Sequence, residues 1–157
     1  MKNLRTPVLC ACLILCSLFS MAQVQHPPIN EPDYNKPKLF NNLPEKITVD
    51  PESFLSSMNK QAGTTISISL SVEKTIPFEG TVLSSVSRNE GKVQTVIVRS
   101  TNYNGATFSM SKVIKEDGNI IYTGRLMSFQ HGDLYVLQQS EGHYMLVKKN
   151  FNDLVNE

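Results

Sequence analysis

The clearest pattern along the chain begins after Gly63, where apolar and polar residues alternate from residue 65 to residue 72. Such alternation predicts a strand with one buried face. Further segments with strand character follow, separated by short breaks that hold the Gly, Asn or Asp residues of tight hairpin turns. We expect these strands at residues 78–86, 92–100, 106–115, 119–128, 134–139 and 143–149.

The order of these segments predicts the fold class. About seven strands joined by hairpin turns, with no helix between them, indicate a mainly β fold built as an antiparallel meander. Such a sheet hides its edges by closing into a small barrel or by folding into a sandwich. Gly80 and Gly124 fall inside strands, where they favour sharp coiling or close packing. Residues 119–129 are apolar on both faces, so we expect that strand to be central or covered on its second side.

One short helix is expected before the first strand. Asp50 supplies an N-cap acceptor, Pro51 suits the first helical position and Glu52 places an acid in the first turn. An apolar stripe follows at Phe54, Leu55 and Met58. Gly63 is expected as the C′ residue, which gives a helix of roughly ten residues.

The N-terminal part of the chain divides into two segments. Residues 1–22 are predicted to be a cleavable export signal, because Lys2 and Arg5 precede an uncharged run and Ser20 and Ala22 mark a cleavage site. The apolar run is about 15 residues, shorter than the roughly 20 that span a bilayer, so no stable membrane span is expected. The chain is therefore expected in the periplasm or outside the cell.

Residues 23–44 are predicted to form an extended arm, since five prolines stand among polar residues there. Near its end, Leu39, Phe40 and Leu43 are expected to dock on the single β-rich domain, residues 45–157.

Removal of the export signal changes the chemistry of the chain. The cysteines Cys10, Cys12 and Cys16 all leave with it, which excludes thiol chemistry in the exported protein. Cys12 follows a small residue, so a lipid anchor at that position is a minor alternative. The 15 basic residues become 13, because Lys2 and Arg5 are lost, against 14 acidic ones. A near-neutral chain argues against a nucleic-acid partner.

No catalytic, cofactor-binding or metal-binding residues are predicted. His131 and His143 lie at opposite ends of a predicted hairpin, on the order of 20 Å apart, so they cannot share a metal ion. The serines lack a Gly-x-Ser-x-Gly elbow, and the acids lie mostly beside turns. The chain is therefore predicted not to be an enzyme, with a small hydrolase as the last alternative.

Aromatic side chains are the remaining candidates for a binding surface. An exposed row of them would suit stacking on a sugar ring or on a partner protein, although burial in the core is the commoner explanation. Tyr122 shares a face with apolar residues and is expected in the core. The candidate binding surface consists of Tyr103, Phe129, Tyr135 and Tyr144.

A series of short motifs runs along the predicted strands: FEGTV at 78–82, YTG at 122–124, GDLYVL at 132–137 and YMLVKK at 144–149. This series resembles the non-catalytic N-terminal β region that precedes the protease domain in some secreted bacterial metalloproteases. It also resembles stand-alone exported proteins of the same pattern. The zinc-binding pattern His-Glu-x-x-His is absent from the sequence, so the resemblance implies an accessory or binding role and assigns no functional residue.

These observations favour an exported, non-enzymatic β domain that binds a protein partner, with a glycan as the second choice of partner. The arm is expected to serve as a tether or as a strand added to a sheet edge. The alternative is a carrier of a small ligand or lipid, which would need an apolar barrel interior.

Overall fold

The computed structural model describes residues 35–151, except for the side chain of Leu55. The predicted export signal and residues 23–34 of the predicted arm lie outside the described residues. Within residues 35–151, no helix has both the length and the apolar character needed to cross a membrane.

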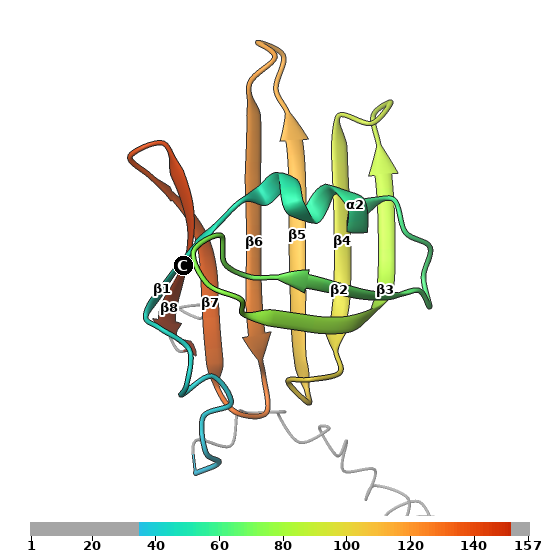
Figure 1. Cartoon of the computed structure of the whole chain (residues 1–157). Coiled ribbons are helices and arrows are strands. Elements are labelled where there is room, and N and C mark those ends of the chain that lie inside the picture. Colours follow the sequence, from blue (N-terminus) through green and yellow to red (C-terminus); the bar gives the residue numbers. More distant parts are fainter. Residues whose placement is uncertain (1–34, 152–157) are drawn as a thin grey trace, which may run out of the picture. The chain divides into compact units, whose positions relative to one another are not determined.

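The described part of the chain is a single curled sheet of eight antiparallel strands with one short helix (Figure 1). The strand order is β1-β8-β7-β6-β5-β4-β3-β2, so consecutive strands from β2 to β8 pair with one another and β1 pairs with β8. The elements are β1 (Lys46–Val49), η1 (Pro51–Phe54), α2 (Leu55–Met58), β2 (Thr65–Ser69), β3 (Pro77–Arg88), β4 (Val93–Ser100), β5 (Ala106–Ile114), β6 (Ile120–Ser128), β7 (Asp133–Ser140) and β8 (His143–Asn150). The predicted antiparallel meander is confirmed, and the sheet curls into a half-barrel.

The strand that the sequence analysis did not predict is β1. Its four residues, Lys46–Val49, turn only Ile47 and Val49 toward the core. Two apolar positions are too few to establish an alternating pattern. β1 exists because it pairs with β8, with Ile47 opposite Leu146.

β3 changes direction in the middle of its length. Its register against β4 shifts between Val82 and Ser84, which marks a bulge, and bulges bend the strand that holds them. The first half of β3 pairs with β2 and crosses in front of the other strands, as Figure 1 shows. Gly80 lies in this first half, where a Cβ would stand 2.5 Å from the Arg99 carbonyl oxygen. The same close approach occurs at Gly124, 2.7 Å from the Ser109 carbonyl oxygen, so the predicted close packing at both glycines is confirmed.

The short helical segment begins as predicted and ends earlier. Asp50 caps it by accepting the Glu52 N–H at 3.0 Å, and Pro51 is the first helical residue. The segment then ends at Met58 after four 3₁₀ and four α-helical residues. The expectation that Gly63 is its C′ residue is wrong: Gly63 has a φ of 88°, but its N–H donates to the Val82 carbonyl at 2.8 Å and extends the β2–β3 pairing.

The core lies on the concave face of the sheet, beneath the helix, β2 and the first half of β3. Aromatic rings form its centre, with centroid distances of 5.1 Å between Phe54 and Phe108 and 5.6 Å between Phe78 and Phe108. β6 is central in the sheet, as the sequence predicted, and Tyr122 is buried. Side chains from the crossing elements therefore fill the concave face.

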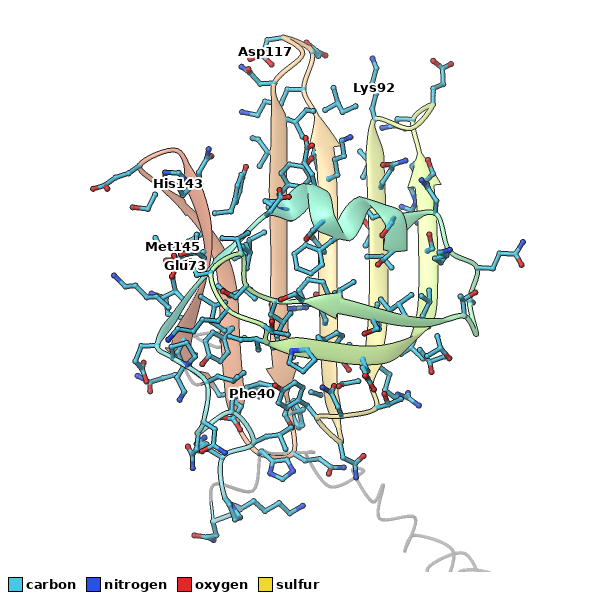
Figure 2. The ribbon with its side chains drawn as sticks, viewed as in Figure 1. Phe40, Glu73, Lys92, Asp117, His143 and Met145 are labelled. Atoms are coloured by element: carbon cyan, nitrogen blue, oxygen red, sulfur yellow. The ribbon has the colours of Figure 1, made fainter. Side chains whose placement is uncertain are left out.

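The end of the predicted arm docks on the half-barrel as expected. Phe40 is fully buried, with ring centroids 5.6 Å from Tyr103 and 5.8 Å from Tyr135. The Leu39 N–H donates to the carboxylate of Asp133 at 2.5 Å. Lys38 donates to two carbonyl oxygens of the β6–β7 turn. Figure 2 shows Phe40 at one end of the half-barrel, with the turns that hold Lys92 and Asp117 at the other.

Candidate functional site

β6 pairs with its two neighbours over different lengths. All nine residues of β6 have partners in β5, from Ile120 opposite Ile114 to Ser128 opposite Ala106. Toward β7, only Arg125–Ser128 are paired. Residues 120–124 of β6 and 137–140 of β7 therefore have no strand partner on the sides that face each other, and we call this unpaired stretch the split. Figure 1 shows β7 and β8 leaving β6 at this end of the sheet.

The split is explained by the pairing of the strands beyond it. β7 keeps its pairing with β8 along its full length, and β8 in turn pairs with β1. The β7–β8 connection is a tight turn in which Glu141 and Gly142 have φ values of 52° and 80°. Positive φ at both central residues is what the type I′ turn of a two-residue β-hairpin requires. These three strands therefore stay paired with one another beyond the point where the β6–β7 pairing ends.

A tyrosine hydroxyl occupies part of the split. The Tyr122 N–H donates to the Tyr144 hydroxyl at 3.2 Å. Backbone groups of successive residues in a strand point to opposite sides, so Ile120 and Gly124 also direct their backbone groups toward the split. The Tyr144 hydroxyl thus stands where a carbonyl of a neighbouring strand would stand.

The hydroxyl of Tyr122 is buried without a hydrogen bond. Its side chain is 8 % exposed, and its ring lies edge-on to the Tyr144 ring with centroids 5.5 Å apart. Among the described residues, no group accepts from or donates to the hydroxyl. A buried polar group in this state costs about 1–3 kcal/mol of stability relative to a bonded one.

The electrostatic surroundings of this hydroxyl are negative. Burial is the main cause that raises the pKa of Tyr122, and the charges of Glu52 and Asp50 raise it further, with Tyr144 between them in size. The hydroxyl is therefore protonated at neutral pH and available as a donor. Lys112 lies directly opposite Tyr122 on β5 and is half-buried. The site combines free strand edges, a phenol donor, two carboxylates and one ammonium group.

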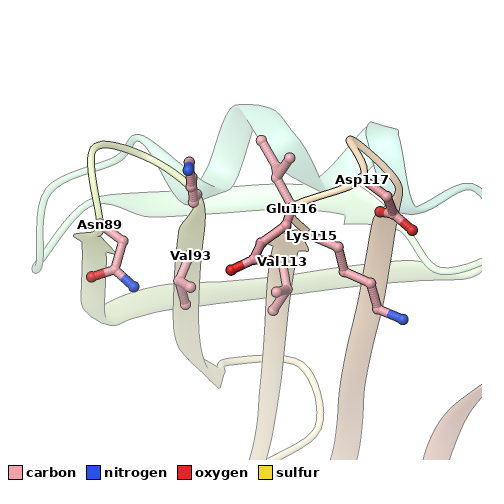
Figure 3. A pocket seen from close by; sticks show the side chains of 8 residues that line it. Asn89, Val93, Val113, Lys115, Glu116 and Asp117 are labelled. Carbon is pink, nitrogen blue, oxygen red and sulfur yellow. The ribbon is translucent and has the colours of Figure 1, made fainter.

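A hollow lies between the β3–β4 turn and the β5–β6 turn (Figure 3). Its volume is about 770 Å³, and its apolar lining includes Val93 and Val113. The acid that Figure 3 shows at its edge, Asp117, is engaged in its own turn, where it accepts from the Asn119 N–H at 3.0 Å. The remaining lining residues are Asn89, Lys92, Ile114, Lys115 and Glu116. Because charges of both signs line this open hollow, it presents no convergent donor set.

The structure places the four predicted surface aromatics at three separate positions. Tyr135 is fully buried and donates its hydroxyl to the Pro44 carbonyl at 2.8 Å, so it offers no surface. Burial, with smaller contributions from Glu45, Asp133 and Tyr103, raises the pKa of Tyr135 to about 12. Its neighbourhood is the docked end of the arm, away from the split.

The other three aromatics are half-buried. Tyr103 lies between the rings of Phe40 and Phe78, with centroid distances of 5.6 and 6.4 Å. Phe129 packs edge-on against Phe151 at 5.3 Å. Of the predicted set, Tyr144 lies at the split. The four side chains do not form one exposed row, because each is packed against another ring.

The sequence analysis did not assign the other residues of the split to a site. Tyr122 was expected in the core, and its backbone N–H and free hydroxyl give no local signal. Asp50 and Glu52 were recognised as a helix start, which they are. A usable signal was Lys112, because it follows Phe108 and Met110 on the core face of an alternating strand, where a charge is rare.

The histidines take separate positions in the structure. His131 contacts the Pro37 carbonyl through Nδ1 at 2.9 Å and belongs to the docked arm, whereas His143 is exposed at the β7–β8 turn. Within residues 35–151, no three His, Cys, Asp or Glu residues gather in a group suited to a metal ion. Comparison of the chain with protein-family models, with curated proteins and with solved structures gives no match.

Proposed function

We propose that the chain is an exported, non-enzymatic β domain that acts as a binding module for a protein partner. The observation that supports this function best is the split, where five residues of β6 and four of β7 lack a strand partner between them. Unpaired strand edges bind extended polypeptides by adding a strand, because main-chain hydrogen bonds supply affinity for any sequence. The partner contributes the missing strand.

The packing of the aromatic rings ranks this function above its alternatives. A glycan site needs an exposed aromatic face, and here the predicted aromatics pack against other rings. A carrier needs an apolar interior with room for a ligand. The side chains of Phe54, Phe78 and Phe108 occupy the concave face of this sheet, so a ligand would have to displace them.

Hydrogen exchange tests this proposal on the purified exported protein. A pool of synthetic ten-residue peptides with high strand propensity serves as the probe. Binding by strand addition is expected to slow exchange of the backbone amides at residues 120–124 and 137–140. The edge strand β2 is the internal control, because its residues 65–69 form the outer edge of the same sheet. Protection at β2 alone, or no protection at any peptide concentration, contradicts the proposal.

A further inference from the structure

Resting on that proposed function, we propose that the split selects an extended segment that carries a lysine or arginine, held by the Tyr122 hydroxyl and the carboxylates of Asp50 and Glu52. The inference names the chemistry of the partner, which strand addition alone leaves open. Main-chain bonds accept any sequence, so selectivity must come from the side chains that line the split.

The Tyr122 hydroxyl is the first group that favours a bound segment. It is a protonated donor with no acceptor among the described residues, although its side chain is more than nine-tenths buried. A group of this kind is destabilising in the free protein, and a bound segment that offers a carbonyl oxygen to it relieves that defect. The hydroxyl therefore favours an occupied split over an empty one.

The sign of the charge at the split is the second feature. Asp50 uses one carboxylate oxygen to cap the helix, and Glu52 is exposed; neither forms an ion pair within residues 35–151. The charges of both carboxylates raise the pKa of Tyr122. Asp50 directly follows Val49, which lies opposite Tyr144 in the β1–β8 pair, so the helix start adjoins the split. Lys112, half-buried opposite Tyr122 on β5, opposes the two carboxylates in charge, but they outnumber this one ammonium group. A cation on the bound segment would therefore gain charge-assisted hydrogen bonds here, and an acid would meet net repulsion.

The Tyr144 hydroxyl accepts the hydrogen bond of the Tyr122 N–H in the free protein. An added strand has to displace it before its own carbonyl can bond to that N–H. Tyr144 is half-buried at the margin of the core and packs edge-on to Tyr122, so its side chain can withdraw more readily than a fully buried one. Tyr144 therefore competes with the partner. The two tyrosines have opposite effects on binding: one hydroxyl contacts the segment and the other blocks it.

Three synthetic peptides test the charge preference on the purified exported protein: acetyl-Thr-Val-Lys-Val-Thr-amide and the same peptide with Gln or Glu in place of Lys. Isothermal titration calorimetry is expected to give the lowest Kd for the Lys peptide, about tenfold below that of the Gln peptide, and the highest Kd for the Glu peptide. Glu52→Gln should reduce the difference between the Lys and Gln peptides. Glu79→Gln is the matched control, because Glu79 is an exposed acid on β3 and should leave the difference unchanged.

Two tyrosine variants separate this role from a structural one. Tyr122→Phe should weaken binding of the Lys peptide severalfold while the unfolding midpoint stays the same or rises. Tyr144→Phe should strengthen binding while the midpoint falls slightly. A Tyr122→Phe protein that loses binding and stability together contradicts the assignment.

The remaining outcomes decide between the two proposals. If all three peptides bind equally, the charge selectivity is wrong and strand addition stands. If none binds, the proposed function falls and the selectivity falls with it. Self-association of the protein through the split, seen as dimers that the Lys peptide does not dissociate, also overturns the inference.

Discussion

The two halves of the β6–β7 boundary differ in whether the strands are paired and in how their tyrosines are bonded. In the closed half, Asp133 is 2 % exposed and its carboxylate accepts the Leu39 N–H, while the Tyr135 hydroxyl donates to Pro44. In the split half, the Tyr122 hydroxyl is buried without a partner and its N–H relies on a neighbouring phenol. The docked arm thus supplies partners for Asp133 and Tyr135 in the closed half, although the Ser128 hydroxyl there is also buried without a partner among the described residues.

This difference suggests that the closed half of the β6–β7 pair serves stability and that the split half serves the proposed binding. A fully bonded buried group holds the fold, whereas an unbonded one lowers stability unless a ligand completes it. Folded proteins keep few such groups, so each one needs a physical explanation. The closed half should therefore respond to substitution with large losses of stability, and the split half with small ones.

The largest expected effect comes from breaking the closed half at Phe40. Phe40→Ala removes a fully buried ring that contacts Tyr103 and Tyr135, and it should lower the free energy of unfolding by about 3–5 kcal/mol. Urea denaturation followed by circular dichroism measures the change. Val72→Ala is the control, because this apolar side chain is 59 % exposed, and it should change the free energy by less than about 0.5 kcal/mol. Equal effects of the two substitutions would show that the arm does not stabilise the fold.

A smaller effect is expected when the same chemical change, the removal of a tyrosine hydroxyl, is made in each half. Tyr135→Phe removes the hydrogen bond to Pro44 and should lower the free energy of unfolding by about 0.5–1.5 kcal/mol. Tyr122→Phe removes a hydroxyl that has no partner, so it should leave the free energy unchanged or raise it. Paired urea denaturation curves measure both values. A loss at Tyr122 as large as that at Tyr135 would mean that the Tyr122 hydroxyl has an unrecognised partner in the free protein.

The smallest expected effect is a loss of stability that appears only at alkaline pH and is absent at neutral pH. Burial raises the pKa of Tyr135 from 10.0 to about 12. The folded state therefore holds this proton more tightly than the unfolded state, so the associated stability is fully present below pH 10 and is lost as the pH rises toward 12. Denaturation midpoints between about pH 9 and about pH 12 should fall more steeply for the unmodified protein than for Tyr135→Phe. Identical slopes would contradict the burial of this phenol.

Much of the fold could be predicted from local patterns. Alternation along the strands, with Gly and Asn at the turns, is a local property, and the structure keeps the strands that it predicts. The strand expected over residues 65–72 is shorter, however, because β2 ends at Ser69 and Val72 is 59 % exposed. Asp50 and Pro51 likewise mark the helix start by local chemistry. β1 was missed because its existence depends on β8, about a hundred residues later. The early helix end was missed because Gly63 serves the β2–β3 pairing instead.

The split could not be predicted, because β6 alternates in the same way where it is paired and where it is not. Nothing in residues 120–124 distinguishes them from residues 125–128, since the difference lies in where β7 runs. Tyr122 has the same sequence context as any core tyrosine on an apolar face, and the lack of an acceptor for its hydroxyl is a property of the assembled core. Lys112 was the one local irregularity near the site.

The pairing of β1 with β8 has a consequence for how the chain folds. Ile47 lies opposite Leu146, so the first strand of the sheet can form only when the last strand is present. Contacts between such distant residues close late and make folding slow, because a long loop must be ordered first. The chain therefore stays incompletely folded until β8 is available to pair with β1. A truncation that removed β8 would leave β1 without its partner and β7 with an open edge, so it should yield a product that aggregates or is degraded.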